Sequence, residues 1–209
     1  MQLTSSSFGD GQGIPGDFAF CLPDPAHHVC LGRNLNPHLA WSDAPTGTKS
    51  FVVLCHDPDV PSCGDDVNQE GRTVPASLPR VDFFHWVLVD LPATVNAIGE
   101  GEFSQTVSPR GKAGPSAPHD ARQGVNNYTD WFANDHDMSG DYYGYDGPCP
   151  PWNDEIVHHY VFTVYALDIE RLPLEGKFGG PEVRAAMTGH VLDQASLTGT
   201  YSLNPAVAG

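Results

Sequence analysis

The stretch EIVHHYVFTVYALD, residues 155–168, decides the expected fold. It is rich in β-branched and aromatic residues, and prolines and a glycine lie just before it, which is typical of a strand. Its side chains are apolar on both faces, so both faces should be covered. Residues 49–57 and 81–92 have the same character, and a shorter strand is expected over 38–43. The sequence therefore predicts a mainly β protein whose three central strands belong to a large sheet, one layer of a sandwich.

Between the strands the sequence is irregular, apart from one helix candidate. Residues 180–195 have Pro181 near their start and apolar residues at i, i+4 and i+8, which predicts a helix. Residues 62–80 and 93–150 are dense in Gly, Pro, Asn, Asp and Ser. Aromatic residues at positions 128, 131, 132, 142, 143 and 145 indicate that the second stretch is an ordered, packed loop. Because no repeat or linker divides the chain, we expect a single domain over 1–209.

Composition narrows the classes of partner. The chain has 209 residues and a formal net charge of −16, so we expect neither nucleic-acid binding nor adhesion to anionic lipid surfaces. The first residues are polar and glycine-rich, without the basic and apolar regions of a secretory signal. No apolar run approaches the length of a membrane span. We therefore expect a soluble, cytoplasmic protein.

The five cysteines, at positions 21, 30, 55, 63 and 149, are widely spaced and form no CxxC pair. This pattern argues against a disulfide framework or a zinc knuckle. Cys55 alternates with apolar residues of its strand and is predicted to be a buried thiol. A pair among the other four remains open.

Polar residues stand near one end of each predicted central strand. Because side chains alternate along a strand, each strand has one row with a polar group: Asp57, His85, and the pair His158 and Tyr160. The expected rows are Phe51, Val53, Cys55 and Asp57; Phe83, His85, Val87 and Val89; and His158, Tyr160, Phe162 and Val164. Any one such histidine is more often a satisfied structural residue than a ligand-binding one. Three strands that end alike favour one small site at the edge of the sheet.

The segment CHDPDVP, residues 55–61, sets two carboxylates on a corner stiffened by prolines. Asp57 precedes Pro58 and is therefore pushed towards extended geometry. The alternative interpretation is an ordinary Asp-Pro turn. Asp57, His85 and His158 are plausible metal ligands, but no metal-binding spacing such as HExxH is present, and there is no GxSxG. We expect no metal, no cofactor and no catalytic residues.

The segments HDPDVP, FFHWVLVDLP and GPCPPWNDEIVHHYVFTVYALD occur in this order, and together they resemble the phosphatidylethanolamine-binding protein family, in its bacterial, Raf-kinase-inhibitor-like branch. The resemblance covers nearly the whole chain. It implies a large antiparallel β-sheet with a smaller second sheet, a few peripheral helices and a small anion-binding pocket. It also implies a cis bond between Val60 and Pro61. The ligand-binding residues carried over from the family's motifs are Asp57, Asp59, His85, Pro150, Pro151, His158 and Tyr160.

Two departures from the family's pattern concern the surroundings of the pocket. His159 stands where the family usually has Arg, and it should face away from His158. Two long insertions, 62–80 and 112–146, are expected to reshape the pocket's surroundings. We expect a non-enzymatic binding protein for a small phosphorylated or carboxylated ligand. The alternatives are a kinase or protease inhibitor that acts through the loop 125–145, and a metal-assisted hydrolase. A homodimer remains open, because some bacterial relatives are dimers.

Overall fold

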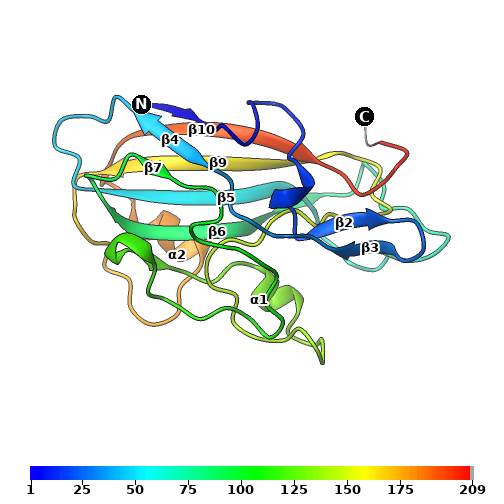
Figure 1. Ribbon diagram of the computed structural model, residues 1–209. Helices are drawn as coiled ribbons and strands as arrows, with labels where there is room; N and C mark the ends of the chain where they lie inside the picture. The colour runs from blue at the N-terminus through cyan, green and yellow to red at the C-terminus, as the bar shows by residue number, and fades with distance from the viewer. Residues whose placement is uncertain (208–209) are drawn as a thin grey trace.

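The chain folds around a five-stranded antiparallel sheet with the strand order β10-β9-β5-β6-β8 (Figure 1). The computed structural model describes residues 1–207. The strands of this sheet are β5 (Ser50–Pro61), β6 (Arg80–Pro92), β8 (Arg122–Gln123), β9 (His158–Leu167) and β10 (Val191–Tyr201). The three central strands expected from the sequence are therefore confirmed, and β5 lies between β6 and β9.

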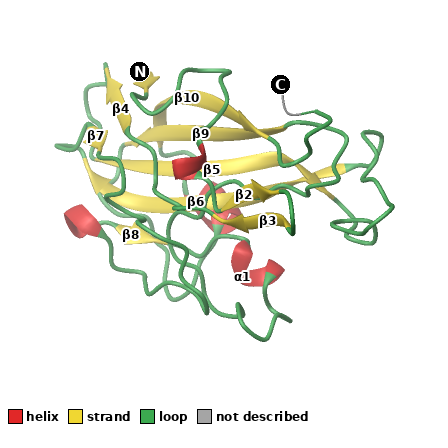
Figure 2. Ribbon diagram, turned by 45° about the vertical axis from the view of Figure 1, so that its right-hand side comes forward, coloured by secondary structure: helices red, strands yellow, loops and turns green. Residues whose placement is uncertain are grey.

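A smaller three-stranded sheet, in the order β1-β4-β7, covers part of one face of the large sheet, and a hairpin of β2 and β3 extends beyond one end of it (Figure 1). The helices are short, and long loops connect the elements (Figure 2). Within residues 1–207 the longest α-helix, α2, has seven residues, so no helix there could cross a membrane. The bounds of these elements are β1 Gln2–Thr4, η1 Gly16–Phe18, β2 Cys21–Asp24, β3 His28–Leu31, β4 Leu39–Ser42, β7 Ala97–Ile98, η2 Pro118–Asp120, α1 Tyr128–Trp131 and α2 Gly180–Ala186.

Apolar residues are buried on both faces of the large sheet, as the sequence predicts. Alternate residues of one strand divide between the two sides: Val53 packs between the two sheets with Trp41, and Leu54 packs on the other side with Val183 of α2. The large sheet, the smaller second sheet and the peripheral helices confirm the predicted mainly β sandwich.

The predicted helix over 180–195 is wrong in its second half. The helix α2 ends at Ala186, and β10 begins at Val191. Gly189 has a φ of +83° between them, a left-handed conformation that ends a helix and that glycine adopts without strain. Residues 191–201 then pair with β9, so strand pairing outweighs the local helical pattern.

The DPDVP segment is not a corner outside the strand, because β5 continues through it to Pro61. The register between β5 and β6 shifts between Asp57 and Val60, and pairing resumes at Val60–Val81 and Pro61–Arg80. Residues before proline prefer extended geometry, and this is also the geometry of a strand. The Val60–Pro61 bond is trans, contrary to expectation, which keeps this part of the strand extended; the cis bond within residues 1–207 is Gly114–Pro115.

A second register shift changes the predicted row of β6. The shift lies where Cys55 pairs with Trp86 and His56 pairs with Phe84, so His85 is an extra residue on the bulged strand. Val87 and Val89 therefore pack on the α2 side of the sheet, although the sequence places them in one row with His85. The bulge lets β6 present His85 to the cavity described below without breaking the core.

One disulfide joins Cys21 of β2 to Cys149, 128 residues further along the chain. The sequence argues against a disulfide framework and leaves a single pair open. The pairing of these two cysteines could not be read from the sequence, because they are far apart along the chain and come together only in the fold. Cys55 is a buried free thiol, as predicted, whereas Cys30 and Cys63 are exposed free thiols.

Candidate functional site

A cavity of about 320 Å³ opens beside the polar end of β5, β6 and β9. Of the seven residues expected from the sequence, all except Asp59 line it. The residues that the structure brings together here are Asp57, His85, Pro150, Pro151, His158 and Tyr160. Their assignment as ligand-binding residues stays a prediction.

His158 is fully buried between two carboxylates. Its Nδ1 lies 2.7 Å from Oδ2 of Asp57, and its Nε2 lies 3.1 Å from Oδ2 of Asp154. Because a carboxylate only accepts hydrogen bonds, both ring nitrogens carry protons and the ring is an imidazolium. Arg80 donates hydrogen bonds to both oxygens of Asp154, to Oδ2 at 2.6 Å and to Oδ1 at 3.0 Å. Two cations and two carboxylates thus form one buried chain of alternating charge.

The pKa values of His158 and Asp154 favour the charged forms of these two residues. Burial on its own would lower the pKa of His158, but the hydrogen bonds to Asp154 and Asp57 outweigh it and raise the pKa to about 9. Burial would raise the pKa of Asp154, and the hydrogen bonds from His158 and Arg80 outweigh it, so that pKa is lowered. His158 is therefore charged at neutral pH, and neither of its N–H groups is left for a ligand.

Asp59 belongs to the outer surface of β5 instead of the cavity. Its Oδ2 accepts hydrogen bonds from the backbone N–H of His159 and from that residue's Nδ1, each of 2.8 Å. His159 faces away from His158, as alternation along β9 predicts, and is exposed. The side chain of Asp57 points inward and that of Asp59 outward, so Asp57 orients the buried histidine.

His85 is oriented by a backbone carbonyl, whereas His158 is oriented by aspartate side chains. Nδ1 of His85 donates to the carbonyl oxygen of Asp146 at 2.8 Å. Burial lowers the pKa of His85, so the neutral ring keeps its proton on Nδ1 and has a lone pair on Nε2. Asp146 is itself fixed by hydrogen bonds from Asn34 and Asn126, each of 2.7 Å, and by an ion pair with Lys112 at 2.9 Å.

Tyr160 places a hydroxyl in the cavity wall, next to His85. The two rings meet edge to face with centroids 5.0 Å apart. The hydroxyl is buried and makes no hydrogen bond of normal geometry with any of residues 1–207, although it lies near the carboxylate of Asp57. Burial, and then the charge of Asp57, hold its pKa well above the usual range, so it keeps its proton. A buried hydroxyl without a partner is costly, and each such group in a native structure calls for an explanation.

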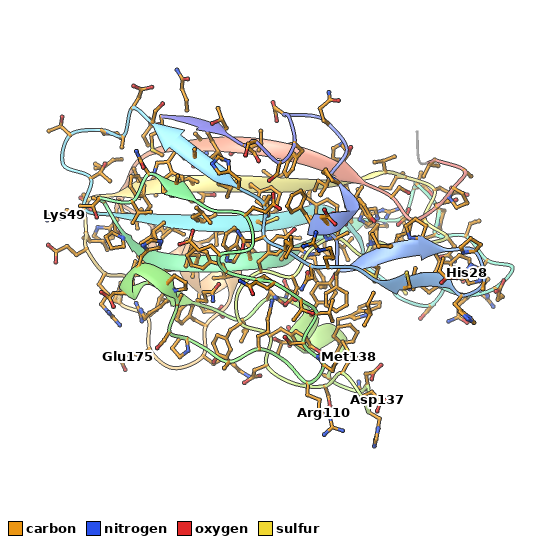
Figure 3. All side chains as sticks on the ribbon, in the orientation of Figure 1. His28, Lys49, Arg110, Asp137, Met138 and Glu175 are labelled. Atoms are coloured by element: carbon orange, nitrogen blue, oxygen red, sulfur yellow. A yellow bond between two sulfur atoms is a disulfide. The ribbon has the colours of Figure 1, made fainter. Side chains whose placement is uncertain are left out.

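The rest of the cavity wall is mostly apolar and is formed by loops and a hairpin outside the large sheet. The loop 62–80 supplies Val67, the loop 112–146 supplies Trp131, and the β2–β3 hairpin supplies Leu31. Figure 3 labels His28 on the hairpin and Met138 on the loop near α1, another lining residue. The two insertions therefore do shape the surroundings of the cavity. The disulfide lies in this wall too, beside Pro150.

Sequence reasoning missed Arg80, Asp146 and Asp154, which hold the histidines in place. Asp154 stands four residues before His158, but its loop geometry could not be read from the sequence. Asp146 contacts His85 through its backbone carbonyl, and any residue type has such a carbonyl, so the sequence gives no signal for this contact. Arg80 directly precedes the predicted strand 81–92, and an arginine at a strand end is usually a solvated residue.

Three of the four ring nitrogens of His85 and His158 are already engaged in hydrogen bonds. Both nitrogens of His158 bind carboxylates, and Nδ1 of His85 binds a carbonyl. Within residues 1–207 no group of three or more His, Cys, Asp or Glu side chains is arranged to hold a metal ion. His158 could therefore act as a metal ligand only after one of these bonds was broken, whereas Nε2 of His85 makes no hydrogen bond within residues 1–207.

Comparison with known proteins finds relatives that this chain covers over most of their length. Residues 4–202 match the family described as phosphatidylethanolamine-binding protein. UPF0098 protein YbhB of Escherichia coli is 34% identical over 97% of this chain and 100% of its own length. UPF0098 protein YbcL of the same species is 29% identical over 97% of this chain and 88% of its own.

Solved structures agree with this match. The crystal structure of E. coli YbcL, described as a new member of the mammalian PEBP family, has a TM-score of 0.67 at 28% identity and covers 96% of this chain and 97% of that one. A homologue from Chlamydia trachomatis, described as a putative phosphatidylethanolamine-binding protein, has a TM-score of 0.63 at 29% identity and covers 96% of both chains. The chain belongs to the phosphatidylethanolamine-binding protein family.

Proposed function

We propose that the chain is a non-enzymatic binding protein whose cavity takes a small phosphoryl or carboxyl group that carries an apolar substituent. One observation carries the proposal: the buried hydroxyl of Tyr160 has no partner within residues 1–207, and it faces an otherwise mostly apolar cavity. Nε2 of His85 also makes no hydrogen bond in this part of the chain. A ligand oxygen at this place satisfies the hydroxyl, and the apolar wall contributes affinity through burial.

The proposal predicts weak and selective binding. A hydrogen bond to a charged group contributes roughly 1.5–3 kcal/mol, and the cost of ordering the ligand is subtracted from this. The buried chain from Asp57 to Arg80 is neutral as a whole, so no net positive charge attracts an anion. Affinity in the micromolar to millimolar range is expected.

An NMR titration with phosphoethanolamine tests the proposal. We compare wild type, Tyr160→Phe, and the control Tyr165→Phe, which lies on the same strand outside the cavity. Loss of the Tyr160 hydroxyl should weaken binding roughly tenfold or more, and the control should bind like wild type. Equal affinities of wild type and Tyr160→Phe, or no binding to any of the three, would sink the proposal.

The two alternatives receive less support. The loop 125–145 buries Tyr128, Tyr142 and Tyr145 and exposes Trp131, so most of its aromatic surface is used internally. Inhibition of a kinase or protease through this loop stays a prediction, and a pull-down with and without the loop checks it. Hydrolysis would require free nitrogens on His158, and both are bonded.

Localisation in the cytoplasm also stays a prediction. Disulfides persist mainly in oxidising compartments, so the bond between Cys21 and Cys149 favours a location outside the reducing cytoplasm. Counting free thiols in protein from separated cell fractions decides the matter: five in a cytoplasmic, reduced chain, and three if this bond is formed.

A further inference from the structure

The polar groups on the cavity floor differ in whether they donate or accept hydrogen bonds. Asp57 only accepts, and its two oxygens have about four acceptor sites, of which His158 and the backbone N–H of Asp59 use two. His85 presents the lone pair of Nε2, because its proton lies on Nδ1 against the carbonyl of Asp146. The hydroxyl of Tyr160 lies near Asp57 without forming a hydrogen bond of normal geometry, so it can donate to a ligand oxygen.

The nearest cation, His158, cannot add a hydrogen-bond donor to the cavity floor. Both N–H groups of His158 point at carboxylates, so the ring has no donor left for a ligand. Lys112 is engaged with Asp146 and with the backbone of Tyr145. The floor therefore offers two acceptors and one donor, which is an unusual pattern for a site that receives an anion.

We propose that the cavity selects an anion that carries a proton of its own, namely the monoanion of a phosphate monoester, and rejects the corresponding sulfate ester. This inference rests on the proposed function. The two esters have the same tetrahedral shape and a charge of −1, and only the phosphate has an O–H. That O–H donates to Asp57 or to Nε2 of His85, and an unprotonated oxygen accepts from Tyr160. A sulfate oxygen placed where the phosphate O–H binds would face only the lone pairs of Asp57 and His85, and it has no proton to donate to them.

The expected discrimination follows from the bond that sulfate cannot make. A hydrogen bond to a charged acceptor corresponds to about tenfold to a hundredfold in affinity. The pH dependence is a second signature. The second ionisation of a phosphate monoester lies near pH 6, so the monoanion becomes about tenfold rarer per unit above about pH 7. The affinity for the phosphate should fall by the same factor, while that for the sulfate should not change.

The two histidines of the floor stay in one state over the pH range of the test. Burial keeps His85 neutral above its lowered pKa, and the pKa of about 9 keeps His158 charged up to about pH 8. The titratable side chains that line the cavity from β5, β6, β9 and α1 are Asp57, His85, Tyr128, His158 and Tyr160, and Cys55, Asp146 and Asp154 lie behind them.

Calorimetric or NMR titrations of the full chain with phenyl phosphate and with phenyl sulfate, at pH 6.5 and 8, test the inference. The expected result is at least tenfold tighter binding of phenyl phosphate at pH 6.5, a fall in its affinity at pH 8, and no such fall for phenyl sulfate. Equal affinities, or tighter binding of the sulfate, overturn the selectivity and leave the proposed function standing. Failure of both esters to bind at either pH overturns both.

A variant adds a check on the acceptor role of Asp57. Asp57→Asn replaces one carboxylate oxygen by an amide that donates, so phenyl sulfate should gain affinity relative to phenyl phosphate. If this variant does not fold, His85→Gln makes the same test at the second acceptor, because the glutamine amide can donate as well. An unchanged ratio of the two affinities in a folded variant contradicts the assigned role.

Discussion

Raising the pH should destabilise this protein through one residue, His158. Its pKa is about 9 in the folded chain and 6.5 for an ordinary histidine. Because the folded value is the higher one, its contribution to stability is fully present below pH 6.5 and is lost as the pH rises through 9. The difference of about 2.5 units corresponds to roughly 3 kcal/mol of unfolding free energy. Asp154 works in the opposite direction: its lowered pKa gives stability that is present above pH 3.8 and is lost in acid.

Urea denaturation at pH values from 6 to 10 measures this loss. Wild type and His158→Gln are compared in a background with Cys30→Ser and Cys63→Ser, because the exposed thiols would otherwise exchange with the disulfide at high pH. Wild type should lose roughly 3 kcal/mol across this range. The variant leaves two buried carboxylates without the cation between them, so it should be about 3–5 kcal/mol less stable at pH 6 and lose much less as the pH rises.

Equal losses in the two proteins between pH 6.5 and 9 would refute the reasoning. If His158→Gln does not fold, the ring protons of His158 in wild type give the same information by NMR. A pKa near or below 6.5 for that ring would mean that the two carboxylates do not outweigh burial.

Three further outcomes are expected. Cys149→Ser opens a disulfide between residues 128 apart in the chain and should cost about 2–5 kcal/mol in the same denaturation assay, and a loss below 1 kcal/mol contradicts this. Gly180→Ala places a Cβ 2.3 Å from the ring of Phe84 and should cost about 1–3 kcal/mol, whereas Gly13→Ala, with nothing within 4 Å, should cost less. Asp59→Ser should bind phosphoethanolamine within about twofold of wild type, since its side chain lies outside the cavity, and a tenfold loss would show that Asp59 acts on the ligand.

The strands could be predicted from the sequence because their signal is local. Residues 155–168 are rich in the β-branched and aromatic residues that strands favour, and β9 lies within them. Alternation also predicts that His158 and Tyr160 point to one side, and both line the cavity. It fails on β6, where the bulge beside His85 moves Val87 to the other face. A bulge is set by pairing with a neighbouring strand, which a single sequence does not show.

The partners of the site residues are harder to predict than the residues themselves. Whether Asp57 or Asp59 orients a histidine depends on which side chain points inward after the register shift. The second carboxylate on His158 comes from a loop residue, Asp154, whose place depends on Arg80 and the chain around it. Residue type and spacing identify the groups that can act, and tertiary contacts decide which bonds they have left to offer.

That distinction changes what the site is expected to recognise. A pocket that collected anions by net positive charge would work against the rest of this chain, whose formal net charge is −16. Asp57 and Asp154 instead neutralise the cations His158 and Arg80. The two carboxylates therefore offset the attraction that His158 would exert on an anionic ligand. Affinity would then come from the apolar wall, and selectivity from the arrangement of one donor and two acceptors on the floor. Such a site would be insensitive to salt, because burial of apolar surface is not screened as an attraction between exposed charges is.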